Sequence, residues 1–222
     1  MTLAKLDERR ARAKKIVAYL KKAYPKPESE LLHDTPMQFV AAVMLSAQCT
    51  DKVVNRVTAP LWEKYKSAKD FARAKQPVFQ KEISSIPFFR NKAKAIINAA
   101  KIIQNDFGGV VPKTEKELVA LPGIGYKTAH VILGELYDSY EGIPTDTHVK
   151  RFAKRFDLTD QDDLKKISKD LEALIPKKDW KYVNNGLVLY GRYVCPARPH
   201  DCADHPLTKL WLPAANRWPR AK

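Results

Sequence analysis

Cysteine, glycine and long apolar runs are all scarce in this chain of 222 residues. The cysteines are only three, Cys49, Cys195 and Cys202, too few for a disulfide scaffold and consistent with a reducing compartment. Eight glycines exclude a glycine-rich low-complexity chain. No apolar run approaches the roughly 20 residues that span a bilayer, and the N-terminus lacks the apolar core of a secretory signal. We therefore expect a soluble cytoplasmic protein with no membrane partner.

Basic residues, by contrast, are in clear excess. Lys and Arg number 40 against 25 Asp and Glu, a net charge of +15, and hydrophobic residues make up 45% of the chain. That apolar content is sufficient for a folded core and argues against a disordered basic tail. Nine basic residues against two acidic ones lie from Lys5 to Lys26, which is either a solvated helix face or a binding surface. The overall charge predicts a polyanionic partner, and we expect nucleic acid.

Apolar residues recur at helical spacing along most of the chain, and no stretch alternates as a strand would. The pattern predicts an all-α fold. In the first helix the expected apolar stripe is formed by Ala11, the stem of Lys14, Ile16, Val17, Leu20 and Tyr24. Helices are predicted over residues 8–24, 37–46, 51–65, 67–75, 77–85, 91–107, 126–136 and 149–156.

The segment 114–136, TEKELVALPGIGYKTAHVILGEL, predicts two helices joined by a tight turn. Thr114 and Glu117 have the spacing of a capping box. Gly123 and Gly125 lack the Cβ atoms that would keep another chain from approaching the backbone. The next helix then presents its N-terminal N–H groups, which suit a phosphate oxygen. The plain alternative is a structural helix–helix turn.

Lys127 and Asp146 are the candidate chemical pair. Lys127 falls in the first turn of the helix after the glycines, where the positive end of the helix dipole favours the neutral, nucleophilic amine. Asp146 or Thr145 is expected to cap the helix that follows, and capping alone would explain an aspartate there. A carboxylate beside a neutral amine also stabilises positive charge on a sugar and moves protons.

Three motifs together resemble the endonuclease III branch of the helix–hairpin–helix DNA glycosylases: LPGIGYKTA, PTDTHVKR and the upstream LSAQCTD. The resemblance runs from about residue 39 to 202. It implies a two-module all-α fold, with a six-helix module over residues 26–142, a second module formed by residues 1–25 and 143–222, and a DNA cleft between them. It also implies excision of oxidised pyrimidines from double-stranded DNA and cleavage at the abasic site. We expect a monomer that acts on the prokaryotic nucleoid.

The resemblance also assigns roles to residues. Lys127 matches the Schiff-base nucleophile and Asp146 the catalytic aspartate. Gln48 matches the residue that fills the gap left by the flipped nucleotide, and Phe88 matches the apolar wedge. The remaining DNA contacts implied are Arg90, Thr128, His148 and the hairpin glycines Gly123 and Gly125, whose carbonyls would also suit a monovalent cation.

The chain departs from the family at the C-terminal loop, where most members hold a [4Fe–4S] cluster with four cysteines. Cys195 and Cys202 keep the first two positions, but His205 and Trp211 stand at the others. Since such a cluster needs four thiolates, we expect no cluster and no other cofactor, with the loop held by packing of Trp211, Leu212 and Trp218. Two other uses of the loop remain open, a Cys195–Cys202 disulfide and a zinc site formed by Cys195, His200, Cys202 and His205.

Two smaller departures concern the DNA contacts. Pro87 replaces a glycine that usually precedes the wedge. His130 replaces a common asparagine, and it is expected either on the helix surface or against DNA.

Three functions follow. The favoured one is a bifunctional glycosylase and abasic-site lyase. The alternatives are a non-catalytic protein that binds damaged DNA, and a monofunctional adenine or mismatch glycosylase. Lys127 argues against both alternatives, because phosphate binding does not require it and the monofunctional branch generally lacks it.

Overall fold

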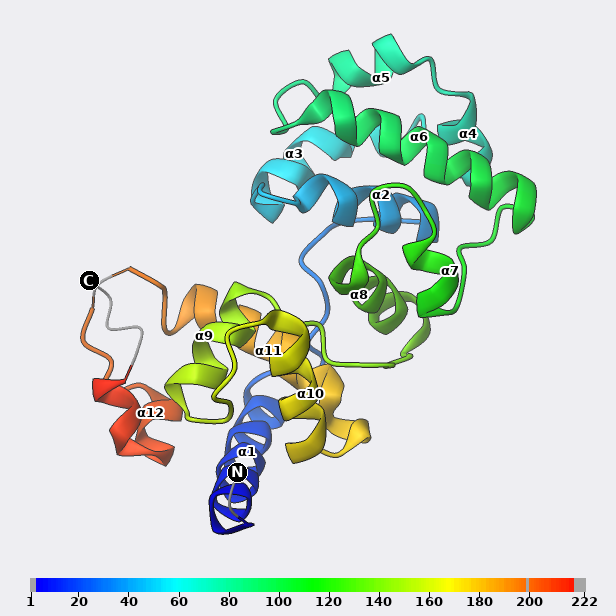
Figure 1. The fold of residues 1–222 in the computed structure, drawn as a ribbon. Coiled ribbons are helices and arrows are strands. Elements are labelled where there is room, and N and C mark those ends of the chain that lie inside the picture. Colours follow the sequence, from blue (N-terminus) through cyan, green and yellow to red (C-terminus); the bar gives the residue numbers. More distant parts are fainter. Residues whose placement is uncertain (1–2, 199, 218–222) are drawn as a thin grey trace. The chain divides into compact units, whose positions relative to one another are not determined.

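The computed structural model describes residues 3–198 and 200–217, and these residues form helices joined by turns, with no strand among them (Figure 1). The all-α prediction is confirmed. The α-helices are α1 (Leu3–Ala23), α2 (Pro36–Ser46), α3 (Asp51–Trp62), α4 (Ala68–Arg73), α5 (Gln76–Glu82), α6 (Phe89–Asp106), α7 (Glu115–Val119), α8 (Tyr126–Tyr137), α9 (Thr147–Arg155), α10 (Leu164–Leu174), α11 (Trp180–Tyr193) and α12 (Pro206–Leu210), with 3-10 helices η1 (Lys177–Asp179) and η2 (Leu212–Asn216).

The chain forms two compact units. The hairpin unit is Ser29–Ser139, and the terminal unit is Met1–Glu28 together with Tyr140–Lys222. The boundaries expected from the sequence were residues 26 and 142. Each unit has its own hydrophobic core.

The hairpin unit is built around α2, which lies between α6 and α8 (Figure 1). A capping box starts α2, because the Thr35 hydroxyl accepts a bond from the Gln38 N–H and the Gln38 side chain accepts one from the Thr35 N–H. The buried Gln38 amide also donates to the carbonyls of Trp62 and Tyr65 at 3.0 and 2.9 Å. Because these carbonyls accept hydrogen bonds from Gln38, α3 ends at Trp62 and not near residue 65, where the sequence predicted its end.

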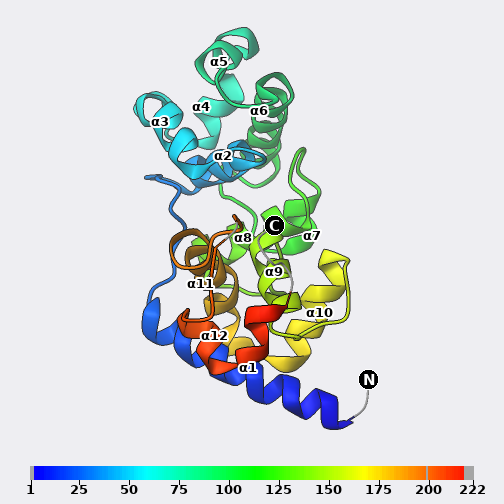
Figure 2. The same ribbon diagram turned by 90° about the vertical axis from the view of Figure 1, so that its left-hand side faces the viewer.

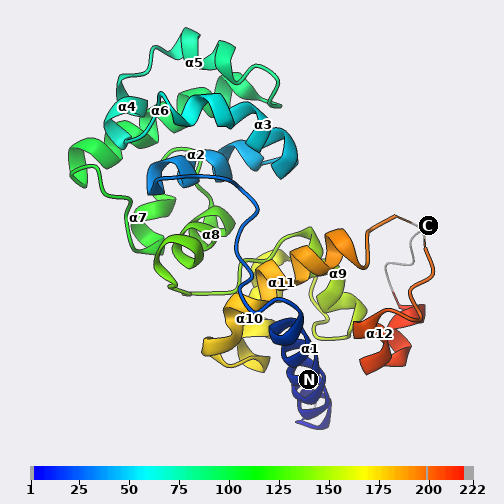
Figure 3. The ribbon, with the colours of Figure 1, turned by 180° about the vertical axis from the view of Figure 1, so that it is seen from behind.

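The terminal unit packs α1 across α10, α11 and α12 (Figure 2). Helix α11 also packs against α9 (Figure 3). Helix α1 begins at Leu3, earlier than residue 8, and its buried face is Arg9, Ala13, Ile16, Val17 and Leu20. The expected stripe was therefore partly wrong.

Ala11 and Lys14 are exposed, because the ion pairs of the buried Arg9 side chain turn a neighbouring face of the helix toward the core. Within the described residues, no helix is both long and apolar enough to cross a membrane.

Candidate active site

The predicted hairpin is present between α7 and α8. The Thr114 hydroxyl accepts a bond from the Glu117 N–H at 3.3 Å and donates to the Glu117 carboxylate at 2.7 Å, which starts α7. Gly123 has a φ of +80°, and a Cβ there would lie 2.9 Å from both Ala95 Cβ and Met44 Cε. Glycine is therefore required at 123 by both the backbone conformation and the packing.

Gly125 plays a different part. It is the N-cap residue of α8, with φ −94°, and it is exposed. A Cβ at this position would meet no atom within 4 Å among the described residues. Because the turn is open here and the cap residue lacks a side chain, a phosphate oxygen can approach the N-terminus of α8.

Lys127 is exposed in the first turn of α8, directly after the glycine loop that ends at Gly125. Thr128, the next predicted DNA contact, is half-buried on the same turn. The glycines, Lys127 and Thr128 thus lie within the hairpin turn and the first turn of α8.

Asp146 is the N-cap of α9 in the terminal unit. Its Oδ1 accepts bonds from the N–H groups of His148 at 2.8 Å and Val149 at 2.9 Å. The Thr145 hydroxyl instead donates to the carbonyl of Ile143 at 3.0 Å, so Asp146 rather than Thr145 caps the helix. Two N–H donors fix the orientation of the carboxylate.

Gln48 and Phe88 share an unusual backbone conformation. Both have positive φ, +56° and +58°, and both are exposed, with 62% of Phe88 accessible. A non-glycine residue in this region costs on the order of 1–3 kcal/mol. Backbone strain at two residues with exposed side chains, one an amide and one an aromatic ring, is typical of residues held for contact with a ligand.

Lys92 connects the two segments that carry these side chains, and the sequence did not identify it. It lies in the first turn of α6, just after Phe88, and its Nζ donates to the carbonyls of Leu45 at 2.8 Å and Ala47 at 2.6 Å, directly before Gln48. Burial lowers the pKa of Lys92. The only sequence signal was a lysine where a helix begins, which gives no indication of a partner so distant in the chain.

Two further predicted DNA contacts are accessible to different extents. Arg90 is exposed, with its guanidinium 4.9 Å from the ring centroid of Phe89. His148 is half-buried in the first turn of α9, with Nδ1 3.5 Å from Nη2 of Arg151.

The surface position expected for His130 is wrong. His130 is 1% exposed, and its Nε2 lies 2.7 Å from Oε2 of Glu115. The pair joins α8 to α7 inside the hairpin, and the Tyr126 ring covers the imidazole with centroids 4.2 Å apart. Burial follows from a partner on the preceding helix, which the spacing within α8 does not reveal.

The C-terminal loop brings Cys195, Cys202, His200 and His205 near one buried arginine. Arg155 donates from Nη1 to Cys195 Sγ at 3.1 Å, from Nη2 to Cys202 Sγ, and from Nε to the carbonyl of Ala214 at 2.9 Å. Burial raises the pKa of the Cys195 thiol and lowers that of the His205 imidazole. Nothing in the spacing of these residues indicates that Arg155 would lie among them.

The donors in this loop do not fit a four-thiolate cluster. Trp211 stands at the last ligand position, where its indole packs against the guanidinium groups of Arg12 and Arg217, 4.4 and 5.1 Å from the ring centroid. The expected packing of the loop is only partly correct, because Leu212 is 69% exposed. Trp218 lies outside the described residues.

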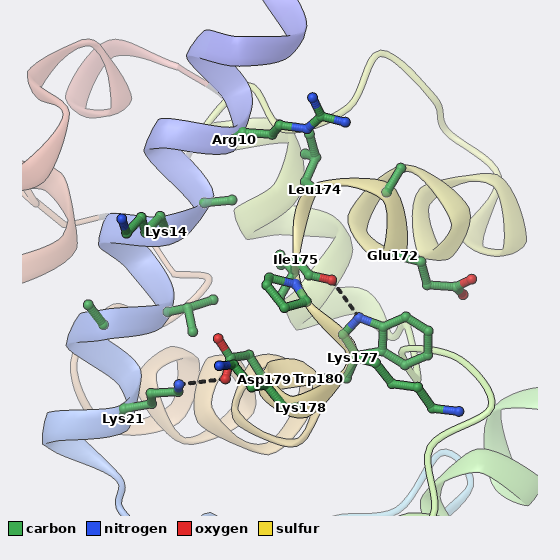
Figure 4. Close-up of a pocket in the computed structure, with 15 residues that line it drawn as sticks. Arg10, Lys14, Lys21, Glu172, Leu174, Ile175, Lys177, Lys178, Asp179 and Trp180 are labelled. Carbon is green, nitrogen blue, oxygen red and sulfur yellow. Dashed lines mark hydrogen bonds and ion pairs between the residues drawn. The ribbon is translucent and has the colours of Figure 1, made fainter.

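A groove of about 1000 Å³ lies in the terminal unit, and neither Asp146 nor the loop cysteines line it (Figure 4). Its floor includes Leu174 and Ile175, and Lys14, Lys177 and Lys178 are among its lining residues (Figure 4). Trp180 closes one side, donating from Nε1 to the carbonyl of Ile175 at 2.8 Å. The groove contains none of the predicted catalytic residues.

Much of the positive charge on α1 is used within the fold. Arg9 pairs with Asp157 at 3.0 Å and Asp160 at 2.7 Å, Arg12 pairs with Asp157 at 3.1 Å, and Lys21 pairs with Asp179 at 2.5 Å. The basic surplus of this segment is therefore not all available to an external polyanion.

Comparison with known proteins identifies the family. Residues 41–177 match the HhH-GPD superfamily of base excision DNA repair proteins. The chain is 43% identical over 188 residues to "Endonuclease III" of Bacillus subtilis, covering 84% of this chain and 85% of the relative. It is 40% identical over 208 residues to "Endonuclease III" of Synechocystis, covering 94% and 95%.

Solved structures agree. "Structure of a non-covalent Endonuclease III-DNA Complex" matches with a TM-score of 0.86 and 33% identity, over 93% of this chain and 97% of that one. "Structure of a Trapped Endonuclease III-DNA Covalent Intermediate: Estranged-Adenine Complex" matches with a TM-score of 0.84 and 34% identity, over 90% and 94%. With this fold, hairpin and extent of identity, the chain belongs to the endonuclease III family of the HhH-GPD superfamily, the DNA glycosylases with abasic-site lyase activity of base excision repair.

Proposed function

We propose that this enzyme excises oxidised pyrimidines from double-stranded DNA and then cuts the strand through a Schiff base on Lys127. The observation that carries the proposal is the position of Lys127, exposed in the first turn of α8 immediately after the open glycine turn. A phosphate held at the N-terminus of α8 would bring the sugar of a neighbouring nucleotide within reach of the amine.

Base release requires the nucleotide to leave the stack, which costs a few kcal/mol. In the proposed complex Phe88 inserts into the stack and Gln48 fills the gap that is left. The strained backbone at these two exposed residues supports these roles, because it holds both side chains toward solvent in the absence of DNA. Arg90, Thr128, His148 and the hairpin glycines would bind the flanking phosphates.

The proposed reaction then breaks two bonds. The neutral Lys127 amine attacks C1′, and the C1′–N bond breaks as its electron pair leaves with the base, which gains a proton. The Asp146 carboxylate takes the proton lost by the attacking nitrogen and stabilises the positive charge on the sugar. The C1′–O4′ bond then breaks as the nitrogen lone pair forms an iminium between Lys127 and C1′, and O4′ takes the proton that Asp146 had accepted.

Strand cleavage follows from that iminium. It acidifies the C2′ proton, whose loss sends an electron pair into a C2′=C3′ bond. The C3′–O bond breaks, and its electrons leave on the 3′ phosphate. Water finally hydrolyses the imine and releases Lys127.

The proposal includes a monomer that acts without a [4Fe–4S] cluster. The incompatible donors His205 and Trp211 support that part. A monovalent cation at the hairpin carbonyls is compatible with the open turn at Gly125.

Borohydride trapping tests the nucleophile directly. On a thymine-glycol duplex and on an abasic duplex, the wild type is expected to give a covalent protein–DNA adduct, and Lys127→Ala none. Lys101→Ala, an exposed lysine of α6 in the same unit, is the matched control and is expected to crosslink like the wild type. An adduct of normal yield with Lys127→Ala would contradict the assignment. A crosslink on the abasic duplex without release of thymine glycol would contradict only the proposed lesion.

A further inference from the structure

We propose that the C-terminal loop binds one Zn²⁺ ion through Cys195, His200 and His205, with Cys202 as the fourth ligand. This inference reverses the sequence expectation of a metal-free loop and is independent of the proposed reaction. It rests on the geometry of the loop.

Three donors are already gathered. The ligand atoms of Cys195, His200 and His205 all lie within 4.8 Å of one another. Zinc–sulfur bonds of about 2.3 Å and zinc–nitrogen bonds of about 2.0 Å in a tetrahedron place neighbouring donors about 3.5 Å apart. Because 4.8 Å is the upper limit of the three separations, no pair of these donors has to approach by more than about 1.3 Å.

His200 is held in the tautomer that a metal requires. Its Nδ1 lies 2.7 Å from the carbonyl of Arg198, and a carbonyl only accepts, so Nδ1 carries the proton. The lone pair of the neutral ring is then on Nε2, which is buried and has no hydrogen-bond partner among the described residues. Metal-binding histidines characteristically donate their second nitrogen to a backbone carbonyl in this way.

His205 offers a second nitrogen of the same kind. Its Nδ1 is also buried, and it likewise finds no partner within the part of the chain that the structure describes. The rings of His200 and His205 stack with centroids 5.0 Å apart. An unsatisfied buried polar atom is energetically costly, so two such atoms beside one buried thiol need an explanation. A cation that accepts a lone pair from each atom provides it.

The two sulfurs complete the set. Cys195 is 1% exposed, and its sulfur and that of Cys202 both accept a bond from the guanidinium of Arg155. The Cys202 sulfur is not among the three donor atoms that lie within 4.8 Å of one another, so its side chain must rotate toward the ion to bind. On binding, the two thiols release their protons, and the two thiolates neutralise the charge of Zn²⁺.

Arg155 is suited to remain beside such a site. It is 2% exposed, and in the described residues its hydrogen bonds reach two sulfurs and the carbonyl of Ala214 but no carboxylate. A buried guanidinium without an anion is costly, whereas thiolates give it charge-assisted partners. We assign Arg155 to donate to the thiolates around the ion, as groups next to metal ligands commonly do.

The donor types select the metal and the role. Two sulfurs and two imidazoles favour Zn²⁺ over the oxygen-binding Mg²⁺ and Ca²⁺. Four protein ligands leave no open position, which is typical of a structural site. The ion would fix the segment that leads from α11 to α12, in place of the cluster that most relatives hold there.

The experiment uses the full chain, stripped with a chelator under reducing conditions and titrated with Zn²⁺. We expect one zinc per chain after dialysis, with two protons released, and a higher Tm with Zn²⁺ but not with Mg²⁺. In His200→Ala, a change at a half-buried residue that leaves the apolar core intact, zinc affinity should fall at least tenfold and the Tm increase should disappear. The matched controls, Cys49→Ser and His33→Ala in the hairpin unit, should retain both.

Three results would overturn the proposal. Zinc below about a tenth of an ion per chain is the first, because mononuclear sites of this type bind tightly at neutral pH. Unchanged zinc affinity in His200→Ala is the second. The third is about four irons per chain with broad visible absorption, which would show that the loop holds a cluster.

Discussion

Phe88 places a large apolar ring in solvent on a backbone that only glycine adopts without strain. We predict that Phe88→Gly leaves the free energy of unfolding unchanged or raises it by up to about 1 kcal/mol, because the relieved strain outweighs the lost ring contacts. Excision from a duplex should fall at least tenfold in kcat/KM, because the wedge is gone. Urea denaturation and single-turnover excision measure the two effects.

Phe88→Leu is the control, since it keeps an apolar wedge and should retain most of the excision rate. The idea fails if Phe88→Gly cuts duplex DNA as fast as the wild type. It also fails if glycine lowers the stability by more than 1 kcal/mol, since the ring would then belong to the fold.

Ion pairs near the N-terminus of α1 hold this helix against the rest of the terminal unit, and their contribution to stability depends on pH. The hydrogen bond from Arg9, reinforced by Lys5, lowers the pKa of Asp160 to about 2. A carboxyl whose pKa is lower in the folded state than its ordinary 3.8 contributes stability that is fully present above pH 3.8. That contribution is lost as the pH falls through about 2.

We therefore predict that the wild type loses stability between pH 4 and 2 more steeply than Asp160→Asn does, while the two differ by a constant amount above pH 5. Equilibrium unfolding in urea at several pH values measures this difference. Asp204→Asn, at a carboxylate 95% exposed, should follow the wild-type curve. Parallel curves for wild type and Asp160→Asn would show that the ion pair contributes nothing.

Elements that depend on local chemistry were predictable from the sequence. The cap at Thr114, the turn at Gly123 and the N-cap at Asp146 all occur where the sequence indicates them. Contacts between distant segments were not predictable. Lys92 reaches carbonyls at the end of α2 and Arg155 reaches sulfurs of the C-terminal loop, and no periodicity encodes such partners.

The same limit explains the error at α1. Helical spacing identifies an apolar stripe, but it treats arginine as exposed, whereas Arg9 is 1% exposed because two aspartates pair with it. At the level of the site, the sequence identified exposed residues such as Lys127 and Phe88 and missed Lys92, which holds the segment beside Gln48.

For the whole molecule, the net charge of +15 includes cations that bind DNA phosphates and cations that form ion pairs within the fold. The salt dependence of DNA affinity distinguishes the two groups. Each cation that binds a phosphate contributes about 0.9 to the slope of log affinity against log salt. Arg90→Ala should therefore lower the slope by about one and weaken binding to an uncleavable abasic-site analogue at low salt. Arg12 instead donates to the carbonyl and carboxylate of Asp157 and packs on Trp211.

Arg12→Gln should therefore leave the slope unchanged and lower the Tm, by about 2–4 °C for each kcal/mol lost. Fluorescence anisotropy across a salt series and a thermal melt measure the two quantities on the same preparations. If Arg12→Gln reduced the slope as much as Arg90→Ala, its guanidinium would be bound to phosphate in the complex and the structural assignment would be wrong. If Arg90→Ala left the slope intact, the exposed start of α6 would lie off the DNA path, and the assignment of Phe88 in the same turn would fail with it.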